Sequence, residues 1–151
     1  MTLPPIYRLL PLLLGCVLTP LTAHARLGGD EASVYTDAQT LGTQTVKTVT
    51  TGYARIDLPT AHGVIHEYLT PNGTVFAITF GGGPTPPLDV LLGTYLDAFK
   101  AGQAPQPGER RNLVINTATL KAFLSGRPYA ISGRIWLPTL TPANVTVESL
   151  Q

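Results

Sequence analysis

The sequence predicts an α+β fold: an antiparallel sheet of about five to seven strands packed on one long amphipathic helix, with a short N-terminal helix. Two observations lead to this prediction. Short β-branched or alternating segments, separated by turn residues, stand on both sides of one long stretch with helical periodicity. Strands joined by short turns pair as antiparallel neighbours, and the apolar stripe of a helix needs a sheet face to cover it.

Residues 1–25 are predicted to be a signal peptide. A short segment ending at Arg8 precedes an apolar run over residues 9–21, and residues 23–25 (AHA) have the small-residue pattern of a cleavage site. The apolar run is shorter than the roughly 20 residues of a membrane span. A lipobox over residues 13–16 (LLGC) is the alternative, and it would place a lipid anchor on Cys16. The apolar run continues beyond Cys16, which favours a soluble exported protein, periplasmic or extracellular.

Residues 26–151 are expected to form a single α+β domain. The only cysteine of the chain is Cys16, so this domain has neither disulfides nor thiolate metal ligands. The whole chain carries 10 basic and 9 acidic residues. This balance argues against nucleic-acid binding, which is typical of strongly basic surfaces. Composition says nothing about the oligomeric state.

The first elements follow from local patterns. Residues 30–41 are predicted to form the short helix, because apolar residues recur there at helical spacing (Val34, Ala38 and Leu41) and Gly42 stops it. Residues 43–51 are rich in β-branched side chains and suit an edge strand. Residues 53–58 alternate between polar and apolar, and Pro59 ends this strand.

Residues 64–70 and 74–80 are predicted to form a hairpin. Pro71 and Asn72 suit a type I turn with Gly73 in the left-handed position, so that Thr70 pairs with Thr74. The register then gives two faces. The face expected to meet the helix contains Val64, His66, Tyr68, Phe76, Ile78 and Phe80. The opposite face contains Ile65, Glu67, Leu69, Val75, Ala77 and Thr79.

The long helix is predicted over residues 86–101, after a loop at residues 81–87 (GGGPTPP). Its apolar stripe comprises Leu88, Leu91, Leu92, Tyr95, Leu96 and Phe99. Further strands are expected at residues 113–115, 120–124 and 129–137, and the strand count and order between Leu113 and Leu137 stay open. No element is assigned to the tail that follows Pro138.

The motif H-x-x-x-H-E over residues 62–67 raises a metal site as a hypothesis. On a strand, however, His62 and His66 stand about 13 Å apart, beyond the reach of one zinc ion. We therefore assign no metal, cofactor or catalytic residue. His66 is instead expected to be structural and neutral, provided that it lies on the helix-facing side without a carboxylate partner. The alternative is a small periplasmic enzyme that uses Glu67, Asp57 and His66 in a cleft beside the helix.

A candidate partner contact lies in residues 129–137 (YAISGRIWL). Period-two alternation points Ile135 and Leu137 to the core and turns Arg134 and Trp136 outward. Trp and Arg are enriched at binding hot spots. The alternative is that residues 138–142 or the N-terminal helix cover Trp136.

Several segments together resemble the family called domain of unknown function 2844, small exported proteins of proteobacteria. The resemblance lies in ARLGG just after the predicted cleavage site, HEYLTPNGTVFAI, LLGTYLDAF and GRIWLPTLTPANV, in that order. It implies an envelope location and no established activity. The favoured function is therefore a non-enzymatic protein-binding or assembly-accessory module of the cell envelope, whose partner is another envelope protein.

Overall fold

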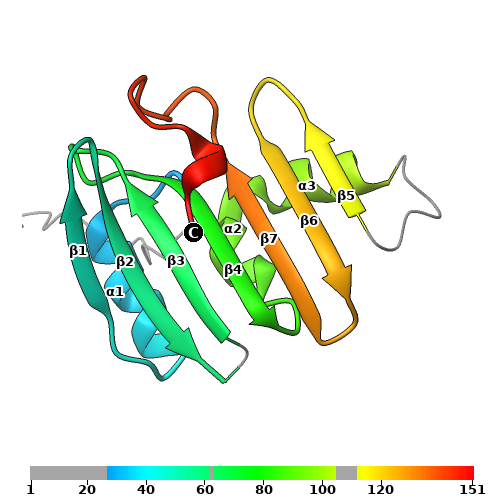
Figure 1. Cartoon of the computed structure of the whole chain (residues 1–151), viewed down its shortest axis with the longest axis horizontal. Helices are drawn as coiled ribbons and strands as arrows, with labels where there is room; N and C mark the ends of the chain where they lie inside the picture. The colour runs from blue at the N-terminus through cyan, green and yellow to red at the C-terminus, as the bar shows by residue number, and fades with distance from the viewer. Residues whose placement is uncertain (1–26, 62, 105–111) are drawn as a thin grey trace, which may run out of the picture.

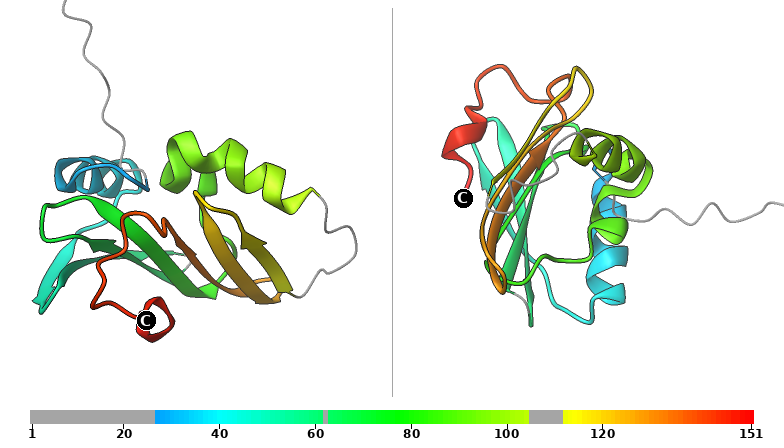
Figure 2. Two further views of the ribbon diagram at one scale, coloured as in Figure 1. Left: turned by 90° about the horizontal axis from the view of Figure 1, so that it is seen from above. Right: turned by 90° about the vertical axis from the view of Figure 1, so that its right-hand side faces the viewer.

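The computed structural model describes residues 27–61, 63–104 and 112–151. Within them the predicted α+β class is confirmed: seven strands form one antiparallel sheet in the order β1-β2-β3-β4-β7-β6-β5 (Figure 1). The helices cover one side of this sheet, and the C-terminal segment lies on the other (Figure 2). We call these sides the helix face and the outer face. The predicted signal peptide, including Cys16, lies outside the described residues.

The strands are β1 Val46–Thr50, β2 Tyr53–Thr60, β3 Gly63–Leu69, β4 Val75–Gly83, β5 Asn112–Asn116, β6 Lys121–Arg127 and β7 Ala130–Trp136. The helices are α1 Glu31–Thr40, α2 Leu88–Leu92 and α3 Leu96–Gln103, with 3-10 turns η1 Gly93–Tyr95 and η2 Val147–Ser149. The predicted edge position of the first strand is confirmed, since β1 and β5 are the outermost strands of the described sheet.

Helix α1 begins and ends where its sequence predicts. Asp30 is the N-cap, and its carboxylate accepts a 2.9 Å hydrogen bond from the backbone N–H of Ser33. Gly42 follows the helix with φ +65°, a conformation that glycine adopts without strain. The buried side of α1 consists of Ser33, Val34, Asp37 and Ala38.

The second helical segment is not the single long helix that the periodicity predicts. It is divided into α2, η1 and α3, because Gly93 has φ +49° and ψ −117°, outside the helical region. Only glycine adopts such a conformation readily, and helical periodicity alone does not reveal it. Leu91, Leu92 and Phe99 are buried in the main core, with Leu88, Tyr95 and Leu96 packed against it.

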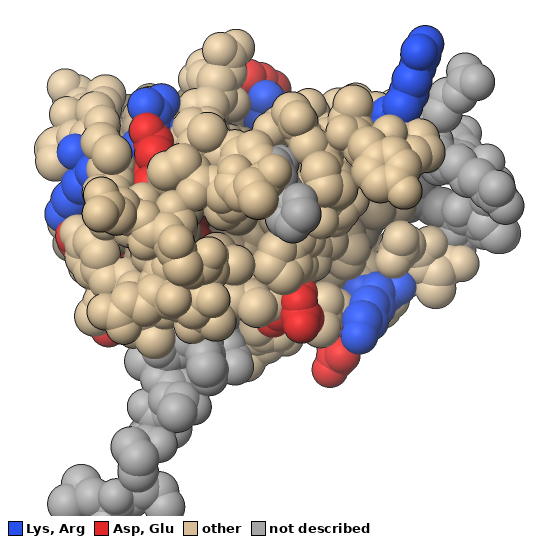
Figure 3. Space-filling model, turned by 90° about the horizontal axis from the view of Figure 1, so that it is seen from below, with Lys and Arg blue, Asp and Glu red and all other residues tan. Residues whose placement is uncertain are grey.

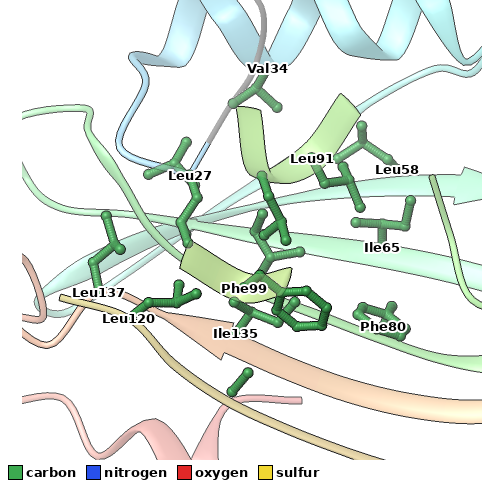
Figure 4. Close-up of a cluster of buried hydrophobic side chains, with 14 of the residues drawn as sticks. Leu27, Val34, Leu58, Ile65, Phe80, Leu91, Phe99, Leu120, Ile135 and Leu137 are labelled. Carbon is green, nitrogen blue, oxygen red and sulfur yellow. The ribbon is translucent and has the colours of Figure 1, made fainter. Parts of the chain in front are cut away.

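The main core lies between the helices and the helix face of the sheet (Figure 4). It includes Leu27, Val34, Leu58, Ile65, Phe80, Leu91, Phe99, Leu120, Ile135 and Leu137. Gly133 is buried in β7, and a Cβ atom at that position would overlap the ring of Phe80. The aromatic ring therefore takes the space that a side chain on β7 would need.

The β3–β4 hairpin has the predicted turn but a different register. The backbone N–H of Thr70 donates to the carbonyl oxygen of Thr74, and Gly73 has φ +80°. Between Tyr68 and Leu69, however, the register shifts: Leu69 pairs with Val75, and Tyr68 pairs with Ala77. Phe76 is the extra residue of a β-bulge.

This bulge makes the predicted division into faces wrong. Ile65 and Leu69 are buried in the main core together with Ile78 and Phe80, so strand alternation also places Glu67 on the helix face. The outer face carries Val64, His66, Tyr68, Phe76, Ala77 and Thr79. The predicted position of His66 against the helix is therefore also wrong.

A second cluster, the outer cluster, lies on the outer face beneath the C-terminal tail, residues 138–151. Its buried members are Tyr68, Phe76, Ala77, Val147 and Leu150, with Tyr53, Trp136, Leu140 and Val145 packed against them. The rings of Tyr53 and Tyr68 are tilted at 59°, with centroids 5.7 Å apart. Through the described ranges, no helix has the length and apolar character needed to cross a membrane.

Candidate functional site on the outer face

One row of outer-face side chains crosses every strand of the described sheet. Register pairs connect its members in turn: Val46, Asp57, His66, Thr79, Arg134, Phe123 and Val114. Neighbouring strands lie about 4.8 Å apart, so His66 and Arg134, which flank β4, are separated by about 10 Å. The middle of the row is polar, and the end on β6 and β5 is apolar.

A groove of 480 Å³ follows the middle of this row. Its lining includes His66, Thr79, Phe123, Ser125, Ser132 and Arg134, and Leu150 and Gln151 of the tail also border it. Small residues account for the hollow, because Gly81 has no side chain and the two serines have short ones. The volume lies in the range of small-ligand sites.

His66 carries a carboxylate partner, so the arrangement assumed for it from the sequence is not found. Its Nδ1 donates a 2.7 Å hydrogen bond to Asp57 Oδ1, and Arg55 Nη2 donates a 3.1 Å bond to Asp57 Oδ2. Asp57 therefore holds the imidazole on one side and a guanidinium on the other. This arrangement fixes the imidazole at one end of the groove.

Glu67 is separated from this group by the sheet itself. It is 1% exposed, its neighbours on adjacent strands are Ile56 and Ile78, and neither carboxyl oxygen has a hydrogen-bond partner among the described residues. Burial raises the pKa of Glu67 to about 8, and the negative charge of Asp37 on α1 adds to this effect. Glu67, Asp57 and His66 therefore do not meet in one cleft beside the helix.

Arg134 lies in the groove without an acidic partner in the described part of the chain. Its Nη2 donates to the main-chain oxygens of Glu148 at 3.2 Å and Leu150 at 3.5 Å, and its Nε is buried without a hydrogen bond. Trp136 is partly buried and packs against the outer cluster, which includes Val147 of the tail. The tail thus lies against both of the residues that the sequence points outward.

Sequence reasoning missed the exposed apolar pair beside Arg134. Phe123 is 45% exposed and Val114 is 50% exposed, and they are direct neighbours on β6 and β5. The available signal was the alternation in β6, where Phe123 stands between two core residues, Ala122 and Leu124. It therefore had to point outward.

Charge is divided between the two sides of the molecule, which the near-neutral total conceals. Strand alternation places most of the described basic residues on the outer face: Arg55, Lys121, Arg127 and Arg134. The acidic residues there are Asp57 and Glu148, while the others belong to the helices, the N-cap or the helix face. With four basic and two acidic residues among those described, the outer face is mildly basic. Seen from below, the charged side chains form small separate groups around a largely uncharged surface (Figure 3).

In residues 27–61, 63–104 and 112–151, no three His, Cys, Asp or Glu side chains gather as a metal site would require. His62 of the H-x-x-x-H motif lies outside the described residues.

The fold and the groove together define a small α+β protein with one sheet face covered by helices and the other partly open. The chain belongs to the family described as protein of unknown function (DUF2844), whose sequence model matches residues 23–150. The resemblance drawn from the sequence motifs is thereby confirmed. No curated protein and no solved structure matches the chain significantly.

Proposed function

We propose that this protein is an exported, non-enzymatic module of the cell envelope that binds a segment of another envelope protein on the outer face of its sheet. The single observation that carries this proposal is the way the outer face holds the chain's own C-terminal tail. Export rests on the signal-peptide pattern of residues 1–25.

The tail contacts combine two features of polypeptide recognition. Side chains donate hydrogen bonds to main-chain oxygens: Tyr68 Oη to Gln151 at 2.6 Å, and Arg134 Nη2 to Glu148 at 3.2 Å. Aliphatic side chains of the tail, Val147 and Leu150, enter an aromatic cluster. Main-chain hydrogen bonds supply affinity for any sequence, whereas apolar pockets supply selectivity.

The groove offers the same chemistry beside the tail. It begins at Leu150 and Gln151 and continues past Arg134 toward Phe123. Aromatic and arginine side chains are the types enriched at binding hot spots. In this proposal Arg134 and Phe123 contact the partner, and Trp136 supports the tail that forms one wall.

The alternative function, an enzyme using Glu67, Asp57 and His66, lacks geometric support. The carboxyl group of Glu67 lies on the helix face, whereas His66 and Asp57 form their hydrogen bond on the outer face. A general acid and base must reach the same substrate, and a closed sheet separates these groups.

Site-specific photo-crosslinking in the native host tests the proposed function. A photoreactive residue at position 123 should capture a polypeptide partner, because it lies at the groove. The matched control is position 49 on β1, where Val49 is 76% exposed but far from the groove. Equal capture from both positions, or none from position 123, would contradict the proposal.

Intact-mass measurement of the exported protein tests the export route. Cleavage after Ala25 is the expected result. A diacylglycerol adduct on Cys16 would instead show a lipid-anchored protein.

A further inference from the structure

We propose that the outer-face groove selects an acidic polypeptide segment, in which a carboxylate binds Arg134 and an apolar side chain two positions away packs on Phe123. This inference rests on the proposed function and specifies the chemistry of the partner. It follows from the hydrogen bonding of Arg134, from the charges around the groove, and from the spacing of the two contact residues.

Arg134 has donor capacity that the protein itself leaves unused. A guanidinium has five N–H donors, and its planar fork matches a carboxylate through two parallel hydrogen bonds. Among the described residues, the partners of Arg134 are uncharged main-chain oxygens of the tail, both bound through Nη2. Nε is buried without a partner, so Nη1 is the donor left for a ligand. No carboxylate of the described residues pairs with Arg134.

The surroundings of the groove favour an incoming negative charge. Two of the described acidic residues lie on the outer face. Asp57 is already engaged by Arg55 and His66 at 2.8 Å and 2.7 Å, and Glu148 is exposed on the tail, where only its main-chain oxygen contacts Arg134. Lys121 lies on the same strand and the same face as Phe123. Like-sign charges around a groove concentrate ligands of the opposite sign.

The spacing of the contacts matches an extended segment. Side chains at positions i and i+2 of an extended chain share a face and stand roughly 7 Å apart. Phe123 and Arg134 are register neighbours on adjacent strands, about 5 Å apart, and Val114 continues the row for about 5 Å more. A segment crossing the strands along the row can therefore place its carboxylate at Arg134 and its next same-face residue over the Phe123–Val114 pair.

Two blocked pentapeptides that differ only in charge test this inference. The probes are acetyl-Val-Gln-Glu-Gln-Val-amide, in which a Val stands two positions from the Glu on either side, and its counterpart with Gln in place of Glu, titrated into the uniformly 15N-labelled domain. We expect the Glu peptide to bind about tenfold more tightly than the Gln peptide at low salt. The amide shifts should centre on Phe123, Ser132 and Arg134, and added salt should weaken the Glu peptide selectively.

Charge variants of the protein complete the test. Arg134→Gln should remove the preference for Glu over Gln, and Arg134→Lys should keep part of it, because lysine retains the charge without the planar fork. Lys100→Gln on α3 removes the same charge far from the groove and should leave the preference intact. Both Arg134 variants alter the contacts with the tail, so a difference between Arg134→Gln and Arg134→Lys reports the loss of charge.

The outcomes distinguish this inference from the proposed function. Equal affinity for both peptides overturns the carboxylate site but leaves polypeptide binding at the groove. Failure of both peptides, with a photo-crosslinker at position 123 still capturing a partner, likewise overturns only the carboxylate site. Selective binding of the Glu peptide without any crosslinked partner supports the carboxylate site and contradicts the proposed function.

Discussion

Glu67 on β3 and Asp37 on α1 place two carboxyl groups at the interface between sheet and helix, with exposed fractions of 1% and 0%. The charge of Asp37 acts on Glu67 and adds to the effect of burial, so that the pKa of Glu67 rises to about 8. Glu67 is therefore protonated at neutral pH. Its carboxyl group is then uncharged, as its aliphatic surroundings favour. Its titration should be visible in the stability of the whole domain.

The free energy of unfolding should fall as pH rises from about 4.5 to 8. In this window the folded state retains a proton on Glu67 that the unfolded state has released, so each pH unit costs about 1.4 kcal/mol. Glu67→Gln removes this dependence. It should match the parent protein near pH 4.5 and exceed it by a few kcal/mol at pH 8. Urea denaturation across this range measures the difference, and Glu148→Gln on the exposed tail is the control. A parallel pH profile for Glu67→Gln and the parent would refute the prediction.

Gly133→Ala should destabilise the domain by about 1–3 kcal/mol, because the new methyl group overlaps the ring of Phe80. Thermal unfolding gives the size of the loss. Gly81→Ala is the control, since its Cβ would meet the hydroxyl of Ser132 at 3.1 Å and that side chain can rotate away. Combining Gly133→Ala with Phe80→Leu should recover part of the loss, and a strictly additive pair would mean that the two side chains do not compete for space.

Leu150→Ala should cost about 2–3 kcal/mol of stability, because Leu150 is 2% exposed within the outer cluster. The variant should also expose the tail to limited proteolysis. Thr146→Ala changes an exposed residue of the same tail and should have little effect. If Leu150→Ala has the same free energy of unfolding and the same rate of cleavage as the parent protein, the tail does not stabilise the outer face.

Asp30→Ala should cost about 0.5–2 kcal/mol by removing the cap of α1. Asp30→Asn retains a side-chain oxygen that can accept from the N–H of Ser33 and should preserve most of the stability. Chemical denaturation of the three proteins tests this order. Similar losses for Ala and Asn would show that charge, rather than the capping hydrogen bond, accounts for the effect.

Sequence periodicity was sufficient for much of the fold, because strand alternation is a local property. It located the seven strands, and it directed Ile135 inward and Trp136 outward on β7. It could not locate the bulge at Phe76. There Phe76 and Ala77, which are adjacent in the chain, are both buried in the outer cluster, with Val147 and Leu150 of the distant tail. A contact between residues so far apart leaves no periodic signal near either one.

The candidate site was predictable only in part for the same reason. Arg134 follows from alternation alone, but the groove depends on the adjacency of β4 and β7 and on the docking of the tail. The pairing of His66 with Asp57 depends on the register between β2 and β3, which alternation within either strand does not fix. Glu67 was correctly placed on the face opposite His66, but the wrong face was assigned to the helix.

The strand order also has a kinetic consequence. Each described strand pairs with its neighbour in sequence except at one junction, between β4 and β7. Two local meanders can therefore form from short-range contacts, and the entropy lost in closing a long loop falls on that single junction. Ile78 and Ile135 face each other there, both buried. Shortening either to valine should slow folding if the junction forms in the transition state, whereas the same change at Ile56 in β2 should mainly accelerate unfolding. The rate of folding is then limited by the pairing of β4 with β7 at the centre of the sheet, and not by the pairing of its edge strands.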